Sequence, residues 1–338
     1  MDIVDYDDVQ FRVTSDGVLQ KMTITKQNGF VDVLIPHILP NGKEITTLGA
    51  YFCKGCDGVY RTVKIDDGIK CVSKEAFSCS NIKKVVWTQG CPYIPEDCFR
   101  SSTISEISNI EHVVSIGNSA FAFTYYLSEF EWPVPCGDIP SNCFVGSALE
   151  KISNTDNVKS IGAAAFSNSE LTSFTVPRKV KTIGDYAFSQ SKLEFVSLHD
   201  DITQIGCCAF EHTKIERIYW PKSCVEVPEG CFNNCVALTK IGLPDTVVSI
   251  LPRAFAGTSI DEFRWPDACR EIPDDCFAFS ALAKITNISH ISSIGKSAFA
   301  DIHTLSEIDL STAAIEYIAF NAFYNTRAKV FYPYYFAN

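Results

Sequence analysis

The chain has few of the features that would point to a nucleic acid or a membrane. Its 40 acidic residues outnumber its 29 basic ones, and the net charge of -11 argues against nucleic acid as a partner, because phosphate binding needs a basic stripe. No stretch approaches 18 uninterrupted apolar residues, so no transmembrane segment is expected. The first thirty residues are rich in Asp and contain no apolar run of the kind found in a secretory signal.

The usual catalytic motifs are also missing. The sequence contains no His-Glu-x2-His, no Gly-x-Ser-x-Gly, no phosphate-binding Gly-rich loop and no dinucleotide fingerprint. Cys207 and Cys208 with His212 suggest a nucleophile and its base. However, Cys208 directly precedes an Ala-Phe pair that recurs along the chain, which favours a structural role. We therefore expect no enzymatic activity and no cofactor.

What the chain does have is phenylalanine at a nearly fixed period. Thirteen of its 24 Phe residues follow one another at steps of 22 to 25 residues, and in twelve cases the preceding residue is Ala or Cys. A period of this length indicates a stacked repeat architecture. We predict a solenoid of about 12 to 13 coils of 22–23 residues, mostly β with short irregular or 3-10 convex segments. The repeating residues are Phe52, Phe77, Phe99, Phe121, Phe144, Phe166, Phe188, Phe210, Phe232, Phe255, Phe277, Phe299 and Phe323.

Each coil combines a strand with a turn. In 171–177, polar and apolar residues alternate, so Phe174 and Val176 are expected to face inward while Ser173 and Thr175 face out, as one rung of a parallel sheet. The Phe and its small neighbour then belong to the convex wall, where Ala or Cys lets successive coils approach closely. Burying each Phe is worth roughly 1.5 to 3 kcal/mol. We interpret this Phe ladder as core, not as a ligand site.

The two ends of the chain depart from the repeat. Residues 1–48 show strand patterns at 9–13 and 18–24 around a Gly17 turn, with a third at 30–36, and are predicted to form an N-terminal β cap. The repeat array is assigned to 49–323. The aromatic segment 324–338 is predicted to be a short C-terminal cap, with an exposed adhesive end as the alternative.

Four tryptophans mark a second, longer pattern. Each begins the pattern Trp-x3-Cys-x2-(Ile/Val)-Pro-x2-Cys-Phe and is expected at the last inward position of its strand. In three neighbouring coils the same position holds Asn109, Asn154 or Asn287. We hypothesise that a large indole on one coil fills space left by a small inward Asn on the next. The tryptophans are Trp87, Trp132, Trp220 and Trp265.

The chain contains fifteen cysteines, most of them at fixed repeat positions. In each Trp coil, two Cys six residues apart are expected inward, either as inert core thiols or as a disulfide within the coil. Cys53 and Cys56 form a Cys-x2-Cys with Cys71 and Cys79 downstream, a weak zinc candidate whose alternatives are loop thiols or a disulfide. The coil pairs are Cys91 with Cys98, Cys136 with Cys143, Cys224 with Cys231 and Cys269 with Cys276.

The units at 160–166, 182–188 and 293–299 share the pattern (Ser/Thr)-Ile-Gly-x3-Ala-Phe. They resemble the BspA-like leucine-rich repeats of bacterial and protozoan surface antigens. The Trp-Pro and Cys-Phe units resemble the protozoan, trichomonad-like branch. The resemblance implies a right-handed solenoid, a surface or secreted location, adhesion to a protein or extracellular-matrix partner, and no catalysis. Since no signal peptide is visible, a cytoplasmic location is the alternative.

Solenoids bind partners across their concave sheet, so the outward strand residues are the candidate site. Aromatic residues and Arg are enriched in interface anchors. Four such residues, Phe195, Arg217, Tyr219 and Arg264, form a run along the outward face, although a merely solvated face is the alternative. We hypothesise a non-enzymatic protein-binding or adhesion protein, with an intracellular scaffold or regulatory interaction module as the alternative. The oligomeric state is not predicted. The candidate residues are Phe195, Arg217, Tyr219, Lys240, Glu262 and Arg264.

Overall fold

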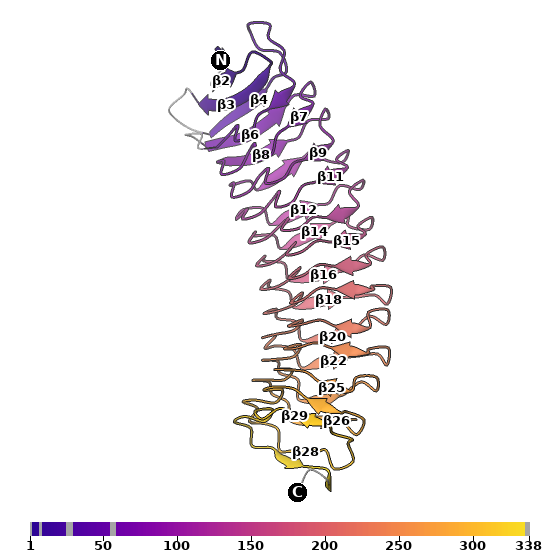
Figure 1. The fold of residues 1–338 in the computed structure, drawn as a ribbon. Helices are drawn as coiled ribbons and strands as arrows, with labels where there is room; N and C mark the ends of the chain where they lie inside the picture. The colour runs from indigo at the N-terminus through magenta and orange to yellow at the C-terminus, as the bar shows by residue number, and fades with distance from the viewer. Residues whose placement is uncertain (1, 7–8, 25–29, 55–58, 335–338) are drawn as a thin grey trace. The chain divides into compact units, whose positions relative to one another are not determined.

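A computed structural model describes residues 2–6, 9–24, 30–54 and 59–334 (Figure 1). Two compact units, Met1–Leu171 and Thr172–Asn338, are each described by themselves. Both consist of stacked coils with short strands and turns, and no α-helix occurs in the described ranges. The predicted β-solenoid is therefore confirmed. It follows that no helix of the described residues is long and apolar enough to cross a membrane.

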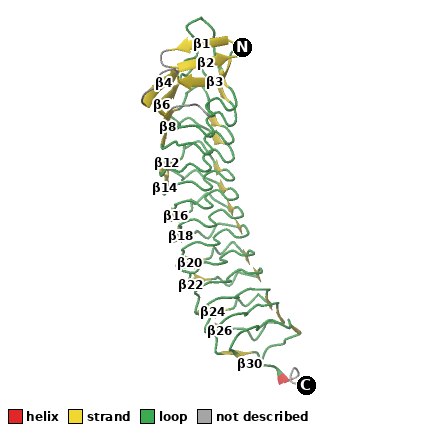
Figure 2. Ribbon diagram, turned by 90° about the vertical axis from the view of Figure 1, so that its left-hand side faces the viewer, coloured by secondary structure: helices red, strands yellow, loops and turns green. Residues whose placement is uncertain are grey.

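Every coil of the array carries one long strand and one short strand, which lie on opposite sides of the coil within each unit (Figure 2). In the first unit the long strands are β4 (Phe30–Ile35), β6 (Val59–Ile65), β8 (Ile82–Val86), β10 (Glu106–Ser108), β12 (Glu129–Glu131) and β14 (Lys151–Ser153). The short strands are β5 (Thr47–Leu48), β7 (Cys71–Val72), β9 (Tyr93–Ile94), β11 (Ser115–Ile116), β13 (Asp138–Ile139) and β15 (Ser160–Ile161).

The second unit repeats this arrangement, and its long strands have three residues each, like β10, β12 and β14. The long strands are β16 (Ser173–Thr175), β18 (Phe195–Ser197), β20 (Arg217–Tyr219), β22 (Lys240–Gly242), β24 (Glu262–Arg264), β26 (Lys284–Thr286), β28 (Glu307–Asp309) and β30 (Lys329–Phe331). The short strands are β17 (Thr182–Ile183), β19 (Gln204–Ile205), β21 (Glu226–Val227), β23 (Ser249–Ile250), β25 (Glu271–Ile272), β27 (Ser293–Ile294) and β29 (Tyr317–Ile318).

The N-terminal strands are continuous with both ladders. β1 (Asp2–Tyr6), β2 (Val9–Val13) and β3 (Val18–Ile24) pair antiparallel, and β3 then pairs in parallel with β5. The strands predicted at 9–13, 18–24 and 30–36 are confirmed, the third as β4, which pairs with β6. The hairpin turn needs Gly17, because its φ is +80° and a Cβ there would lie 2.6 Å from the Glu44 carbonyl oxygen. The boundary at residue 48 stays a prediction.

The Phe ladder is buried, as predicted. In each unit the rings of successive coils stack nearly parallel from Phe77 onwards, for example Phe99 on Phe121 at 5.5 Å between centroids and Phe188 on Phe210 at 5.6 Å. Both Phe188 and its neighbour Ala187 are fully buried. Offset stacking of this kind adds about 0.5–1.5 kcal/mol per pair beyond area burial.

The turn that carries each Phe forms its own hydrogen-bond ladder. The N–H groups of Tyr186, Phe188 and Gln190 donate to carbonyls of the next coil at 2.8, 2.9 and 2.8 Å. The residues two before and two after the Phe, such as Tyr186 and Gln190, have φ near +60°. Among the described residues with positive φ none is β-branched, as expected for a conformation that β-branched side chains avoid.

The two strand ladders, in contrast, are interrupted. Normally the residue after a short strand donates its N–H to the preceding coil, as Gly206 does to the Ile183 carbonyl at 2.9 Å. All four Trp coils have proline at this position, and proline has no N–H to donate; these residues are Pro95, Pro140, Pro228 and Pro273. At Pro95 only the short-strand ladder is interrupted, because β8 still pairs with β6. At the other three prolines the preceding short strand and the preceding long strand both belong to other sheets. We call these three boundaries the first, second and third seam; their prolines are Pro140, Pro228 and Pro273.

The Trp coils have a physical basis that the pattern alone did not reveal. In all four coils the buried indole N–H donates to the carbonyl of the Cys four residues later, at 2.8–3.2 Å. The prediction that Asn109, Asn154 and Asn287 point inward is wrong. Each has φ of 62–63° and donates its side-chain amide to the Trp carbonyl of the preceding coil. Asn154 is exposed and the others half-buried, so they act as surface caps rather than spacers in the core.

Candidate protein-binding surface

The six candidate residues lie on three neighbouring pairs of long strands. Arg217, Tyr219 and Lys240 share the β20–β22 sheet, whereas Phe195 on β18 lies across the second seam. The remaining two residues, Glu262 and Arg264, lie on β24, across the third seam. All six side chains are exposed, so their predicted outward orientation is confirmed. The β20–β22 pair is thus the centre of the surface.

Tyr219 is the most prominent side chain of this surface, at 81% exposure. In the strand register it lies beside Gly242. A Cβ on Gly242 would meet Cδ1 of the Tyr219 ring at 2.9 Å, so the ring lies over a residue that has no side chain. Phe195, 57% exposed, likewise pairs with a small residue, Ser173. Each aromatic ring can therefore present most of its area to a partner.

Two cations lie next to each other beside this ring. Arg217 and Lys240 are register partners on parallel strands. Among the described residues no ion pair is recorded for either, although the chain as a whole is acidic. Like charges side by side on a sheet are destabilising. The uncompensated pair is therefore better suited to an anionic group on a partner than to holding the fold.

Arg264 differs from Arg217 because its guanidinium is already engaged. It contacts Asp267 at 3.1 Å and Asp245 at 3.7 Å. A hydrogen bond from the Asn287 amide, followed by the one from Arg264, lowers the pKa of Asp267. The structure therefore separates the candidate residues into a free cationic pair and a neutralised Arg.

Shallow hollows open on the long-strand side at two seams. At the third seam a cavity of about 170 Å³ lies between β22 and β24, lined by Gly242, Asp245, Glu262 and Arg264 among others. At the first seam a cavity of about 470 Å³ lies between β10 and β12. A seam therefore leaves space between long strands that a continuous ladder would close.

Comparison with models of protein families identifies the family of this chain. The model described as "BspA type Leucine rich repeat region (6 copies)" matches residues 26–149, 137–250 and 225–332. The chain belongs to this family. No curated protein matches this BspA-type chain.

Solved structures share the fold of this BspA-type chain at low identity. A leucine-rich repeat protein from Bacteroides ovatus has a TM-score of 0.75 at 20% identity, covering 96% of this chain and 90% of that one. The pneumococcal vaccine antigen PcpA has a TM-score of 0.53 at 15% identity, with coverage of 97% and 88%. A leucine-rich repeat protein from Eubacterium ventriosum has a TM-score of 0.50 at 18% identity, with coverage of 96% and 94%. These likenesses concern the fold alone.

The cysteines of this BspA-type chain mostly belong to its core. All eight Cys of the Trp coils are buried free thiols in the structure. Burial raises the pKa of Cys136 to about 12 and that of Cys269 to about 11, which disfavours the reactive thiolate. Cys53 is fully buried, while Cys56 lies outside the described residues, so the weak zinc candidate is not tested.

Sequence reasoning missed the groups that shape this surface. It did not identify Gly242 as the place where the Tyr219 ring lies, nor Asp245 and Asp267 as partners of Arg264. The seams, however, can be recognised from a pattern in the sequence. The three seam coils combine Trp-Pro with a second proline seven residues later, whereas Trp87 is followed by Thr88, whose hydroxyl bonds to carbonyls of the preceding coil.

Proposed function

We propose that this chain is a non-enzymatic binding protein that engages another protein through the outward face of β20 and β22. The observation that carries the proposal is the exposed ring of Tyr219 beside the uncompensated pair Arg217 and Lys240. Aromatic residues and Arg are the residue types that most often anchor protein interfaces. Leucine-rich-repeat solenoids are typically binding scaffolds, which supports the same conclusion.

The charge of the surface indicates the chemistry of the partner. Two adjacent cations favour a partner that places a carboxylate between them, next to an apolar patch that covers Tyr219 and Phe195. Binding of this type weakens as salt screens the charges. The partner is therefore expected to be a protein with an acidic, partly apolar surface, and an extracellular-matrix protein is one candidate.

The test is affinity capture with matched variants. Crosslinked partners are recovered with wild type and with the double variant Arg217→Ala/Tyr219→Ala. The control is Lys151→Ala/Tyr125→Ala, which removes an exposed cation and an exposed tyrosine from the first unit. Recovery of the partner should fall only with the first variant, and more at low salt than at high salt. Unchanged recovery of the partner with Arg217→Ala/Tyr219→Ala would contradict the proposal.

We further propose display at the cell surface or secretion. The description of a structural neighbour as a vaccine antigen supports this location. The protozoan origin rests on the Trp-Pro and Cys-Phe units alone, since the three neighbours compared above are bacterial. The alternative is an intracellular scaffold. Labelling of intact cells with a membrane-impermeant biotin reagent distinguishes the two, because an intracellular protein stays unlabelled.

A further inference from the structure

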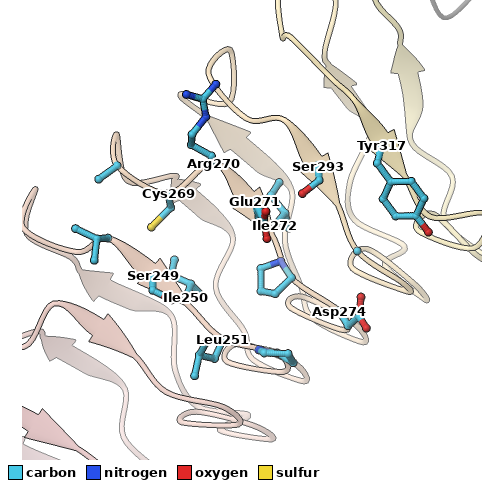
Figure 3. A pocket seen from close by; sticks show the side chains of 15 residues that line it. Ser249, Ile250, Leu251, Cys269, Arg270, Glu271, Ile272, Asp274, Ser293 and Tyr317 are labelled. Atoms are coloured by element: carbon cyan, nitrogen blue, oxygen red, sulfur yellow. The ribbon is translucent and has the colours of Figure 1, made fainter.

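A second cavity opens at the third seam, on the short-strand side of the coils (Figure 3). Its volume is about 640 Å³, within the range of about 300–1,000 Å³ that is typical of ligand sites. Ile250 and Leu251 line it from the β23 coil, and Arg270 and Glu271 from the β25 coil, with Tyr317 at the far end (Figure 3). None of these residues belongs to the surface proposed above.

The cavity is bordered by a backbone carbonyl that receives no hydrogen bond from the strand ladder. In the next coil Gly295 donates its N–H to the Ile272 carbonyl at 2.8 Å, and in the preceding one Leu251 donates to the Val227 carbonyl at 2.9 Å. The equivalent donor to the Ile250 carbonyl would come from Pro273, which has no N–H. β23 and β25 accordingly belong to separate sheets. The Ile250 carbonyl therefore lacks its ladder bond and borders an open space.

The side chains around this acceptor carry both charge and apolar surface. Arg270 and Glu271 are exposed, and no ion pair is recorded for either in the part of the chain that the structure describes. Leu251 and the rings of Pro252 and Pro273 supply apolar walls. A ligand for this space thus needs a hydrogen-bond donor, a carboxylate for Arg270 and apolar groups.

We propose that this cavity binds an extended peptide segment of a protein partner. The peptide donates a backbone N–H to the Ile250 carbonyl, in place of the donor that Pro273 lacks, and one of its carboxylates pairs with the Arg270 guanidinium. An extended peptide suits the site because its backbone carries the same donors and acceptors as the missing rung of the ladder. A charge-assisted contact with Arg is among the stronger hydrogen bonds in proteins.

The chain itself suggests a substitution that closes the cavity. Where glycine follows a short strand, the coil approaches its predecessor so closely that a Cβ would be 2.3 Å from backbone at Gly117 and 2.4 Å at Gly206. Pro273→Gly supplies the missing N–H and removes the ring, so the two short strands can pair. The matched control is Pro140→Gly, which makes the same change at the first seam.

The probe is a random library of hexapeptides with acetylated and amidated ends, screened against wild type, with a glycan array as a parallel arm. Peptides selected on wild type should contain an acidic residue. Their affinity for Pro273→Gly and for Arg270→Ala should be at least about tenfold lower than for wild type. Their affinity for Pro140→Gly should equal that for wild type. Arg270→Ala keeps the test decisive if Pro273→Gly fails to fold, as judged by circular dichroism.

Three outcomes overturn the proposal: no peptide is selected, the selected peptides bind both variants as tightly as wild type, or only glycans bind. Failure here leaves the β20–β22 surface unaffected, because Arg217 and Tyr219 are intact in every variant.

Discussion

At the scale of single residues, the turns of the solenoid impose a backbone conformation that most side chains disfavour. Phe279 has φ of 60° and is 70% exposed, whereas the same turn position holds Gly257 or Asn234 in other coils. Asn tolerates this conformation far better than Phe. We predict that Phe279→Asn stabilises the protein by about 1 kcal/mol, measured by urea unfolding. Phe279→Ala keeps the disfavoured conformation and should gain nothing, so equal stability of both variants would contradict this explanation.

The buried thiols make stability depend on alkaline pH. Burial raises the pKa of Cys136 from its ordinary 9.0 to about 12. Below pH 9 the thiol is protonated in both the folded and the unfolded state, so its ionisation does not lower the free energy of unfolding there. Between pH 9 and 12 only the unfolded chain releases the proton, so the free energy of unfolding should fall by up to about 1.4 kcal/mol per pH unit for this thiol. Urea midpoints at pH 8 and 10 measure the fall, which should be smaller in Cys136→Ala.

At the scale of elements, the Phe ladder connects the turns to the core. Phe188 is fully buried and stacks on Phe210. Truncating it leaves a cavity between coils, so Phe188→Ala should destabilise the protein by about 3 to 5 kcal/mol, measured by denaturant unfolding. Phe279→Ala is the matched control, since it deletes the same ring from an exposed position. A cost for Phe188→Ala no larger than for this control would mean that the ladder is not the core.

The periodicity was sufficient to predict the solenoid, the buried Phe and the outward strand residues. The spacing of residues in the repeat shows which side chains lie on the same face of successive coils. The face that carries the apolar residues is then the buried one. The periodicity could not predict which short strands pair, because that pairing depends on a single N–H, as at Pro273. The orientation of Asn154 was also inaccessible, since it follows from a positive φ and from a bond to the Trp132 carbonyl, not from side-chain size. Gly242 acquires its role only from the ring that lies over it.

At the scale of the whole molecule, each unit is continuous on its turn side and segmented on its strand sides. Hydrogen bonds of the turn ladder cross the third seam, from Arg253, Phe255 and Gly257 to the next coil, while neither strand ladder does. Repeat proteins owe their stability to interfaces between neighbouring coils. A boundary that lacks two of its three ladders should therefore be the first to open locally.

Hydrogen exchange measures this opening directly. β25 is paired on one side only, with β27, whereas β27 is paired on both sides, with β25 and β29. We predict that native-state exchange is faster for amides of β25 than for those of β27, and slowest for the Phe255 and Phe277 amides of the turn ladder. Pro273→Gly supplies the lost donor and should slow exchange in β25 while leaving β27 unchanged. Equal exchange rates in β25 and β27 of the unaltered chain would show that the third seam does not weaken the stack.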